Sequence, residues 1–228
     1  MAHQASVVFV VDDDASVRRS LALLIESAGW QVMTFGSAQE FLSFAGVSCS
    51  SCLVLDLDLP DLDGLELQKR VASRREMPII FISGHGDVPT TVRAMRGGAM
   101  EFLTKPIASD TLLDAIHQAL ERSSAALAQA AALQSLRARH DSLTSREREV
   151  MALVVSGLLN KQIGARLDIS EITVKAHRGS MMRKMSAPSL AHLVNMTAML
   201  GIAPGDSNAQ SRFVAQREAA MIVTARAL

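Results

Sequence analysis

The stretch CLVLDLDLPDLDG, residues 52–64, joins a short apolar run to four closely spaced aspartates. A brief run rich in Leu and Val, followed by turn residues, predicts a strand that is buried on both faces of a parallel sheet. The aspartates, Asp56, Asp58, Asp61 and Asp63, begin where that strand should end. The question for the rest of the chain is which of these carboxylates performs chemistry, and on what.

The same alternation of apolar run and amphipathic helix continues on both sides of this stretch. It predicts a doubly wound, five-stranded parallel sheet in an α/β fold. Ser37 and Glu40 form a capping box for the second helix. We expect strands at 7–11, 30–35, 52–57, 78–83 and 100–104, and helices at 17–28, 38–45, 64–75, 89–98 and from about 109.

The two halves of the 228-residue chain differ in charge. Residues 1–122 hold 16 acidic and 10 basic side chains, net −6, whereas residues 123–228 hold 7 and 13, net +6. The split favours a cation or phosphate site in the first half and a polyanion partner for the second. A chance division of solvated surface charge is the plainer alternative.

Because no apolar stretch reaches the roughly 20 residues of a membrane span, we expect a cytoplasmic protein with no membrane partner.

We expect four segments: an α/β domain at 1–122, a helical linker at 123–140, a separate all-α domain at 141–202 and a tail of unknown role at 203–228. In the last helix of the first domain, Leu113, Leu120 and Leu127 are seven residues apart. This spacing fits either a helix that pairs with a second copy or a plain extended helix.

Short helices are expected from residue 141 onward, at 145–156, 160–167, 171–185 and 189–200. Thr144 and Glu147 form a capping box for the first of them. A helix, a tight turn and a second helix rich in Lys, His and Arg predict a helix-turn-helix. The helix at 171–185 should then lie in the major groove of DNA.

Polar residues follow the strands of the first half at the edge where ligands bind in open parallel sheets. They are Asp12, Asp13, Asp56, Ser83 and Lys105. Crowded carboxylates favour a hard divalent cation, and Mg²⁺ typically binds one or two carboxylates together with phosphate oxygens. A carboxylate can itself accept a phosphoryl group, giving an aspartyl phosphate.

These motifs resemble a known family over nearly the whole chain. VVDDD (10–14), LVLDLDLPDLDG (53–64), FISGHGDVP (81–89) and EFLTKP (101–106) resemble the receiver domain of bacterial two-component response regulators. The segment from LTSREREV to MMRKM (143–185) resembles the LuxR-type output domain. Together they resemble the FixJ/NarL group, and the FixJ branch most closely, which implies that the sheet of the first half is of the flavodoxin-like type.

The resemblance implies roles for the polar residues that follow the strands of the first half and for several of their neighbours. Asp56 is the phosphoacceptor, and Mg²⁺ is held by Asp13, by Asp12 through water, by Asp56 and by the backbone carbonyl of Asp58. The side chain of Asp58 could alter metal affinity or phosphoryl lifetime, or could simply be solvated. The resemblance also implies that Ser83 and Lys105 bind the phosphoryl oxygens and that Phe102 is an aromatic switch residue. It further implies a cis peptide bond at Lys105-Pro106. Asp61 and Asp63 are expected to form turns.

In the second half, contacts to bases or phosphates are expected from Lys175, His177 and Arg178. Contacts to the DNA backbone are expected from Asn160, Lys161, Thr173, Arg183 and Lys184. An ordinary solvated helix face is the alternative for these charges. Gly179 is unusual inside a helix.

The resemblance implies a non-enzymatic transcriptional response regulator. A sensor histidine kinase would phosphorylate Asp56, and the protein would dimerise, bind promoter DNA and act with RNA polymerase, with activation as the tendency of the family. One alternative is a phosphorylation-independent DNA-binding regulator with a vestigial receiver. Another is a phosphatase of the haloacid dehalogenase type, although Pro60 stands where its signature has Thr. Cys49 and Cys52 are either incidental thiols or a redox pair.

Overall fold

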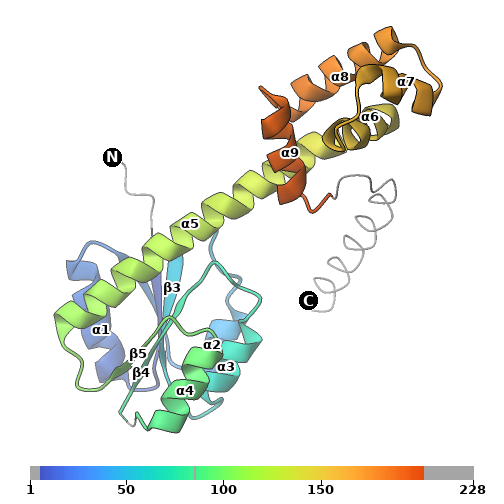
Figure 1. The fold of residues 1–228 in the computed structure, drawn as a ribbon. Helices are drawn as coiled ribbons and strands as arrows, with labels where there is room; N and C mark the ends of the chain where they lie inside the picture. Colours follow the sequence, from blue (N-terminus) through green and yellow to red (C-terminus); the bar gives the residue numbers. More distant parts are fainter. Residues whose placement is uncertain (1–5, 85, 203–228) are drawn as a thin grey trace. The chain divides into compact units, whose positions relative to one another are not determined.

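The structure is a computed structural model that describes residues 6–84 and 86–202 (Figure 1). The chain divides into two compact units, Met1–Ala130 and Ala131–Leu228. The expected tail at 203–228 lies outside the described residues. No helix in the described parts of the chain is both long enough and apolar enough to cross a bilayer.

The first unit is the expected α/β fold. Its parallel sheet has the strand order β2-β1-β3-β4-β5, with the order reversing between β1 and β3. In such a sheet, ligands bind outside the carboxyl ends of the strands at the reversal. The elements are β1 (Val7–Val11), α1 (Ala15–Ser27), β2 (Gln31–Phe35), α2 (Ala38–Ser43), β3 (Ser51–Asp56), α3 (Gly64–Arg70), β4 (Ile79–Ser83), α4 (Val88–Arg96), β5 (Glu101–Thr104) and α5 (Ser109–Asp141).

Side chains alternate along each central strand, so the sheet has a core on each face. On one face, Phe9, Leu53 and Phe81 pack with residues of α2, α3 and α4. On the other face, Val54 and Ile80 pack with residues of α1 and α5. Because β1, β3 and β4 are buried on both sides, they read as continuous apolar runs in the sequence.

The two cysteines lie on opposite faces of this sheet. Cys52 is buried in the core beneath α1 and α5, whereas Cys49 packs against the core of the other face. Both thiols are free, and burial raises the pKa of Cys52 to about 12. This placement supports the interpretation of incidental thiols over that of a redox pair.

Among the helices that end earlier than their sequence pattern indicates, two stop where a nearby side chain enters the core. The helix expected at 38–45 ends at Ser43, because Phe44 turns inward and its ring lies 5.7 Å from the rings of Phe9 and Phe35. The helix expected at 64–75 ends at Arg70, where Val71 enters the core. In both cases a tertiary contact overrides the local preference for helix.

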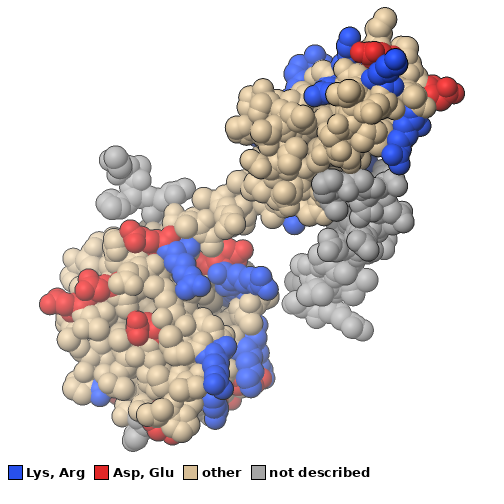
Figure 2. Space-filling model, in the orientation of Figure 1, with Lys and Arg blue, Asp and Glu red and all other residues tan. Residues whose placement is uncertain are grey.

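The second unit consists of the end of α5 together with α6 (Ser145–Val155), α7 (Asn160–Leu167), α8 (Glu171–Met185) and α9 (Leu190–Met199). Figure 2 shows several Lys and Arg side chains on its helices. Its core is rich in methionine, with Met151, Met181 and Met185 fully buried and Met182 and Met196 packed against them.

The segment expected as a linker, 123–140, is helical throughout as part of α5. Its first residue, Ser123, is buried in the first unit, where its hydroxyl accepts a hydrogen bond from the backbone N–H of Ser51 (2.9 Å) and donates one to the carbonyl of Glu76. Near its end, Leu136 is buried in the core of the second unit. One continuous helix therefore contributes to both cores.

Candidate functional site

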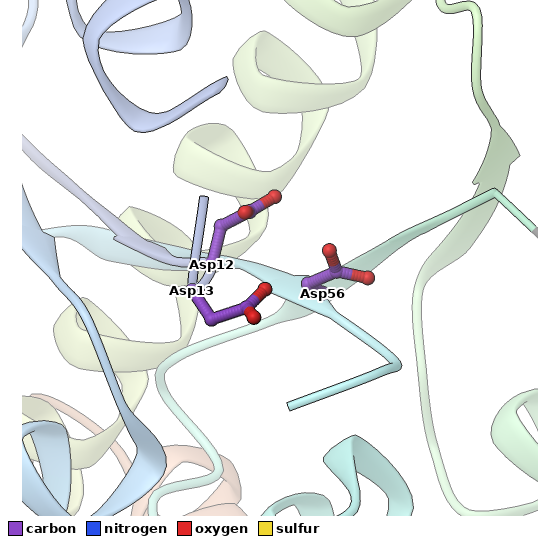
Figure 3. Close-up of side chains that lie close together, drawn as sticks. All are labelled: Asp12, Asp13 and Asp56. Carbon is purple, nitrogen blue, oxygen red and sulfur yellow. The ribbon is translucent and has the colours of Figure 1, made fainter. Parts of the chain in front are cut away.

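Three carboxylates meet at the carboxyl ends of the neighbouring strands β1 and β3. Asp12 and Asp13 directly follow β1, and Asp56 is the last residue of β3. Figure 3 shows the three side chains gathered in one place, and one oxygen from each lies within 4.8 Å of the others. Asp12 and Asp56 are buried and Asp13 is exposed, so the cluster opens to solvent on one side.

Lys105 places its ammonium group against two of these carboxylates. Its Nζ lies 2.9 Å from Oδ2 of Asp12 and 2.6 Å from Oδ2 of Asp56. The end of β5 positions this residue, because the backbone N–H of Lys105 donates to the carbonyl of Ser83 at the end of β4 (2.8 Å). The Lys105-Pro106 peptide bond is cis, as the resemblance implied.

Burial and the ion pairs shift the pKa values of Asp12 and Lys105 in opposite directions. Burial raises the pKa of Asp12 above its ordinary value, although hydrogen bonds from Lys105 and from the N–H of Asp14 oppose this. Burial alone would lower the pKa of Lys105, but its hydrogen bonds to Asp56 and Asp12 outweigh burial and the pKa is raised. Lys105 therefore stays charged and neutralises part of the acidic cluster.

The donor set of this cluster fits a hard divalent cation. Three carboxylates from two adjacent segments supply oxygen ligands, which Mg²⁺ and Ca²⁺ prefer, and the open side leaves room for waters and a phosphate group. Asp58 is exposed, and its carboxylate is not one of the three clustered groups. Its backbone N–H donates to Oδ1 of Asp56 (3.3 Å). The expected metal contact through the carbonyl of Asp58 stays a prediction.

Ser83 and Phe102 lie on the adjacent strands β4 and β5. Ser83 is fully buried at the end of β4 and pairs in register with Thr104 of β5. Phe102 is half-buried, and its ring stacks on Phe81 with centroids 6.1 Å apart. Because residues two apart on a strand share a face, Ser83 and Phe102 face the same side of the sheet.

The remaining aspartates of the 52–64 stretch have structural roles. Asp63 caps α3, accepting from the N–H of Leu65 (2.8 Å). Asp61 accepts from the N–H groups of Ala38 (3.2 Å) and Gln39 (2.9 Å), and so ties the start of α2 to the loop after β3. Burial alone would raise the pKa of Asp61, but these hydrogen bonds outweigh burial and the pKa is lowered. Asp61 is therefore more than the turn-former that the sequence predicted.

Gly64 is a residue of this site that the sequence reasoning missed. The backbone of α3 begins so close to β3 that a Cβ on Gly64 would lie 2.6 Å from the carbonyl oxygen of Asp56. The N–H of Gly64 also donates to the carbonyl of Leu57 (3.0 Å). A glycine directly after the aspartate-rich turn was the available signal, since glycine permits this approach.

In the second unit, α7 and α8 form a helix-turn-helix. Asp168 ends α7 in the left-handed region, with φ 52°, and the side chain of Ser170 caps α8. The turn crosses α7 closely, because a Cβ on Gly164 would lie 2.7 Å from the carbonyl oxygen of Ile169. This geometry matches the motif that the sequence predicted.

The residues expected to contact DNA fall into two groups. Lys161, Lys175 and Arg183 are exposed, although Lys175 pairs with Glu171 of its own helix (3.3 Å). The others are half-buried: Thr173, His177, Arg178, Asn160 and Lys184. Their expected contacts with DNA stay predictions.

Two of the half-buried cations have partners inside the unit. Arg178 donates to Oδ1 of Asn160 (3.1 Å), which joins α8 to the start of α7. Lys184 places its Nζ 2.7 Å from Oε2 of Glu147, whose carboxylate also accepts from the N–H of Thr144 (2.8 Å) in the capping box of α6. The sequence predicted the capping box but not the ion pair.

Glu147 is 4% exposed, and its charge is strongly stabilised. Hydrogen bonds, from Lys184 first and from Ser180 second, lower its pKa to about 2. The pair therefore links α6 to α8 through two charges, one of which is buried.

Both halves match family models. Residues 8–117 match the response regulator receiver domain, and residues 141–197 match the bacterial regulatory proteins of the luxR family. The chain is 49% identical over 198 residues to nodulation protein W of Bradyrhizobium diazoefficiens, which covers 86% of this chain and 87% of that protein. It is 43% identical to the transcriptional regulatory protein FixJ of Rhizobium meliloti, covering 86% and 97%.

A solved structure agrees with these relatives. The response regulator StyR superposes with a TM-score of 0.76 at 46% sequence identity, over 85% of this chain and 98% of that one. The family consists of transcriptional regulators and not of enzymes, which removes the phosphatase alternative. The chain belongs to the transcriptional response regulators of two-component systems, with a receiver domain followed by a LuxR-type DNA-binding domain.

Proposed function

We propose that Asp56 accepts a phosphoryl group from a sensor histidine kinase, with Mg²⁺ held by Asp12, Asp13 and Asp56, and that this step controls promoter binding by the second half of the chain. The observation that carries the proposal is the cluster of three carboxylates within 4.8 Å, with Lys105 against two of them. A vestigial receiver would have no need to keep this complete set.

The residues around Asp56 suit it to accept a phosphoryl group. One carboxylate oxygen accepts from the N–H of Asp58 (3.3 Å) and the other from Lys105 (2.6 Å), so the side chain is held in one orientation. In the transfer, a bond forms between an Asp56 oxygen and phosphorus while the bond from phosphorus to the kinase histidine breaks. When bound, Mg²⁺ neutralises charge on the phosphoryl oxygens.

Lys105 and Ser83 complete the proposed site. The ammonium of Lys105 is close enough to Asp56 to bind a phosphoryl oxygen there, and the hydroxyl of Ser83 lies at the end of the adjacent strand. Movement of Ser83 toward that oxygen would alter the space available to Phe102 on the same face of the sheet. The phosphoryl group thereby biases a two-state element, in which the surface around α4 and β5 differs between the states.

We further propose that the phosphorylated form dimerises, binds promoter DNA in the cytoplasm and regulates transcription together with RNA polymerase. The support is the helix-turn-helix with its exposed cations and the transcriptional role named for the relatives. Activation is the direction we expect from the resemblance to the FixJ branch.

The test is labelling of the full chain with acetyl phosphate in the presence of Mg²⁺. We expect label on the wild type and on Asp63→Asn, a matched control because Asn also caps helices and Asp63 lies outside the cluster. We expect none on Asp56→Asn. Label that persists in Asp56→Asn, or never appears on the wild type, refutes the proposal.

A second measurement separates regulation from a vestigial receiver. Gel filtration and DNA binding are compared with and without the phosphodonor. We expect a dimer and tighter DNA binding only when the wild type is labelled. Identical DNA binding in both conditions would instead support the phosphorylation-independent alternative.

A further inference from the structure

The outward face of α8 is apolar at its centre. Ile172, the second residue of the helix, is 79% exposed. Ala176, Gly179 and Arg183 are also exposed, and their spacing of four, three and four residues places them on one stripe with Ile172. The opposite side of the helix is buried in the core through Val174, Met181 and Met185. These three residues therefore determine that the stripe faces outward.

Arg183 ends the stripe, and the side chains of Lys175, His177 and Arg178 lie at its edges or turn away from it. Arg178 is half-buried and bonded to Asn160, and His177 is half-buried as well. Lys175, on one flank, is exposed. The first two turns of the stripe therefore present Ile172 and Ala176 to whatever lies against the helix.

The position of Ile172 indicates what that surface contacts. A single exposed apolar residue is ordinary on a protein surface. Ile172, however, stands in the first turn of the second helix of a helix-turn-helix, where N-terminal residues face base edges in the major groove. In that groove thymine alone presents a methyl group, and apolar side chains read it by contact. The cations of Lys175 and Arg183 suit the phosphates of the same duplex.

We propose that Ile172, with Ala176 one turn further on, selects thymine in the operator through contact with its 5-methyl group. This inference rests on the DNA-binding function of the second half and adds a specificity-determining contact to it. It predicts a thymine in each half-site beneath the start of α8. In this proposal, apolar contacts along the stripe recognise the base, and Lys175 on the flank of the stripe contributes a positive charge.

The probe is duplex DNA in which deoxyuridine replaces thymine, because deoxyuridine lacks only the methyl group. Duplexes are first selected from a random library with the full chain, Mg²⁺ and acetyl phosphate. Each thymine of the selected site is then replaced in turn. At one position per half-site we expect about a fourfold loss of affinity for the wild type, the size expected for one apolar carbon removed from contact.

The same duplexes are measured with two variants. In Ile172→Ala the loss at that position should disappear, because the partner of the methyl group is gone. Leu159→Ala is the matched control, since Leu159 is also apolar and 69% exposed but precedes α7 and lies outside the stripe. It should keep the fourfold loss. Both positions are exposed, so neither substitution removes a core contact.

The inference is overturned if no deoxyuridine substitution weakens wild-type binding, or if Ile172→Ala shows the same loss as the wild type. Either result leaves DNA binding itself intact. Failure to enrich any duplex would differ visibly, because it would overturn the DNA-binding function together with this inference.

Discussion

Replacing Lys184 by Met distinguishes the expected role of this residue from the one its contacts indicate. The sequence predicted a contact between Lys184 and the DNA backbone. In the structure, its ammonium group lies 2.7 Å from the carboxylate of Glu147, which is 4% exposed. Lys184→Met keeps much of the apolar stem and leaves that carboxylate buried without its cation. We therefore expect the second unit to lose stability.

The magnitude follows from the charge of Glu147. Its pKa falls from 4.5 to about 2 in the folded protein. A shift of this size corresponds to about 3 kcal/mol of stabilisation in total. Ser180 and the N–H of Thr144 supply part of it, and the side chain of Lys184 is 34% exposed, so solvent screens the pair. We expect Lys184→Met to lower the free energy of unfolding by about 2 kcal/mol, somewhat below the cost of breaking a fully buried pair.

Urea unfolding of the full chain measures this change with an internal reference. The single tryptophan, Trp30, lies in the first unit, so its fluorescence follows that unit alone. Far-ultraviolet circular dichroism follows the helices of both units. In Lys184→Met the dichroism transition should move to lower urea, while the fluorescence transition stays in place.

Lys161→Met is the matched control, because Lys161 is exposed in the first turn of α7 and the change in charge is the same. It should leave both transitions unchanged, and it should reduce the salt dependence of DNA binding by about one phosphate contact. If Lys184→Met proves as stable as Lys161→Met, the ion pair contributes nothing to the stability of the second unit.

Four further outcomes are expected. Gly64→Ala places a Cβ 2.6 Å from the carbonyl of Asp56, so tryptophan fluorescence in urea should show a loss of about 1–3 kcal/mol, and acetyl phosphate labelling should slow. Gly179→Ala has open space around its Cβ and should stabilise the second unit by about 1 kcal/mol; an unchanged dichroism melt would contradict this. The lowered pKa of Glu147 means that its contribution is complete above pH 4.5 and is lost as pH falls toward about 2; acid titration by dichroism should show this loss, and Glu147→Gln should reduce it. Lys105→Met removes the cation that competes with a metal for two carboxylates, so calorimetry should show tighter Mg²⁺ binding, and weaker binding would argue against that competition.

The receiver site could be predicted from the sequence because the geometry of a parallel sheet brings its parts together. Asp12 and Asp56 are far apart in the chain, but each follows a buried apolar strand. Once the runs are recognised as strands of one parallel sheet, their carboxyl ends must meet at one edge. Lys105 joins them for the same reason, at the end of β5.

The features that the sequence did not predict depend on contacts between elements. The Lys184–Glu147 pair requires the crossing of α6 and α8, which no local pattern encodes. The early end of α2 depends on where the ring of Phe44 packs. The approach of Gly64 to Asp56 depends on how α3 begins against β3. Local signals locate helices and strands, whereas packing decides where they stop and which charges they bring together.

The core of the second unit, on which the buried face of α8 packs, is rich in methionine. Met181 and Met185 are buried side chains of α8 itself, and Met151 of α6 lies in the same core. An unbranched thioether has three rotatable bonds and refills a cavity of changed shape at little cost, whereas a branched aliphatic side chain resists such a change. The helix that we propose to bind DNA therefore packs on a core that can adapt its shape. We expect that small changes in the tilt of α8 can follow local variation in duplex geometry from one operator to another without leaving cavities in this core.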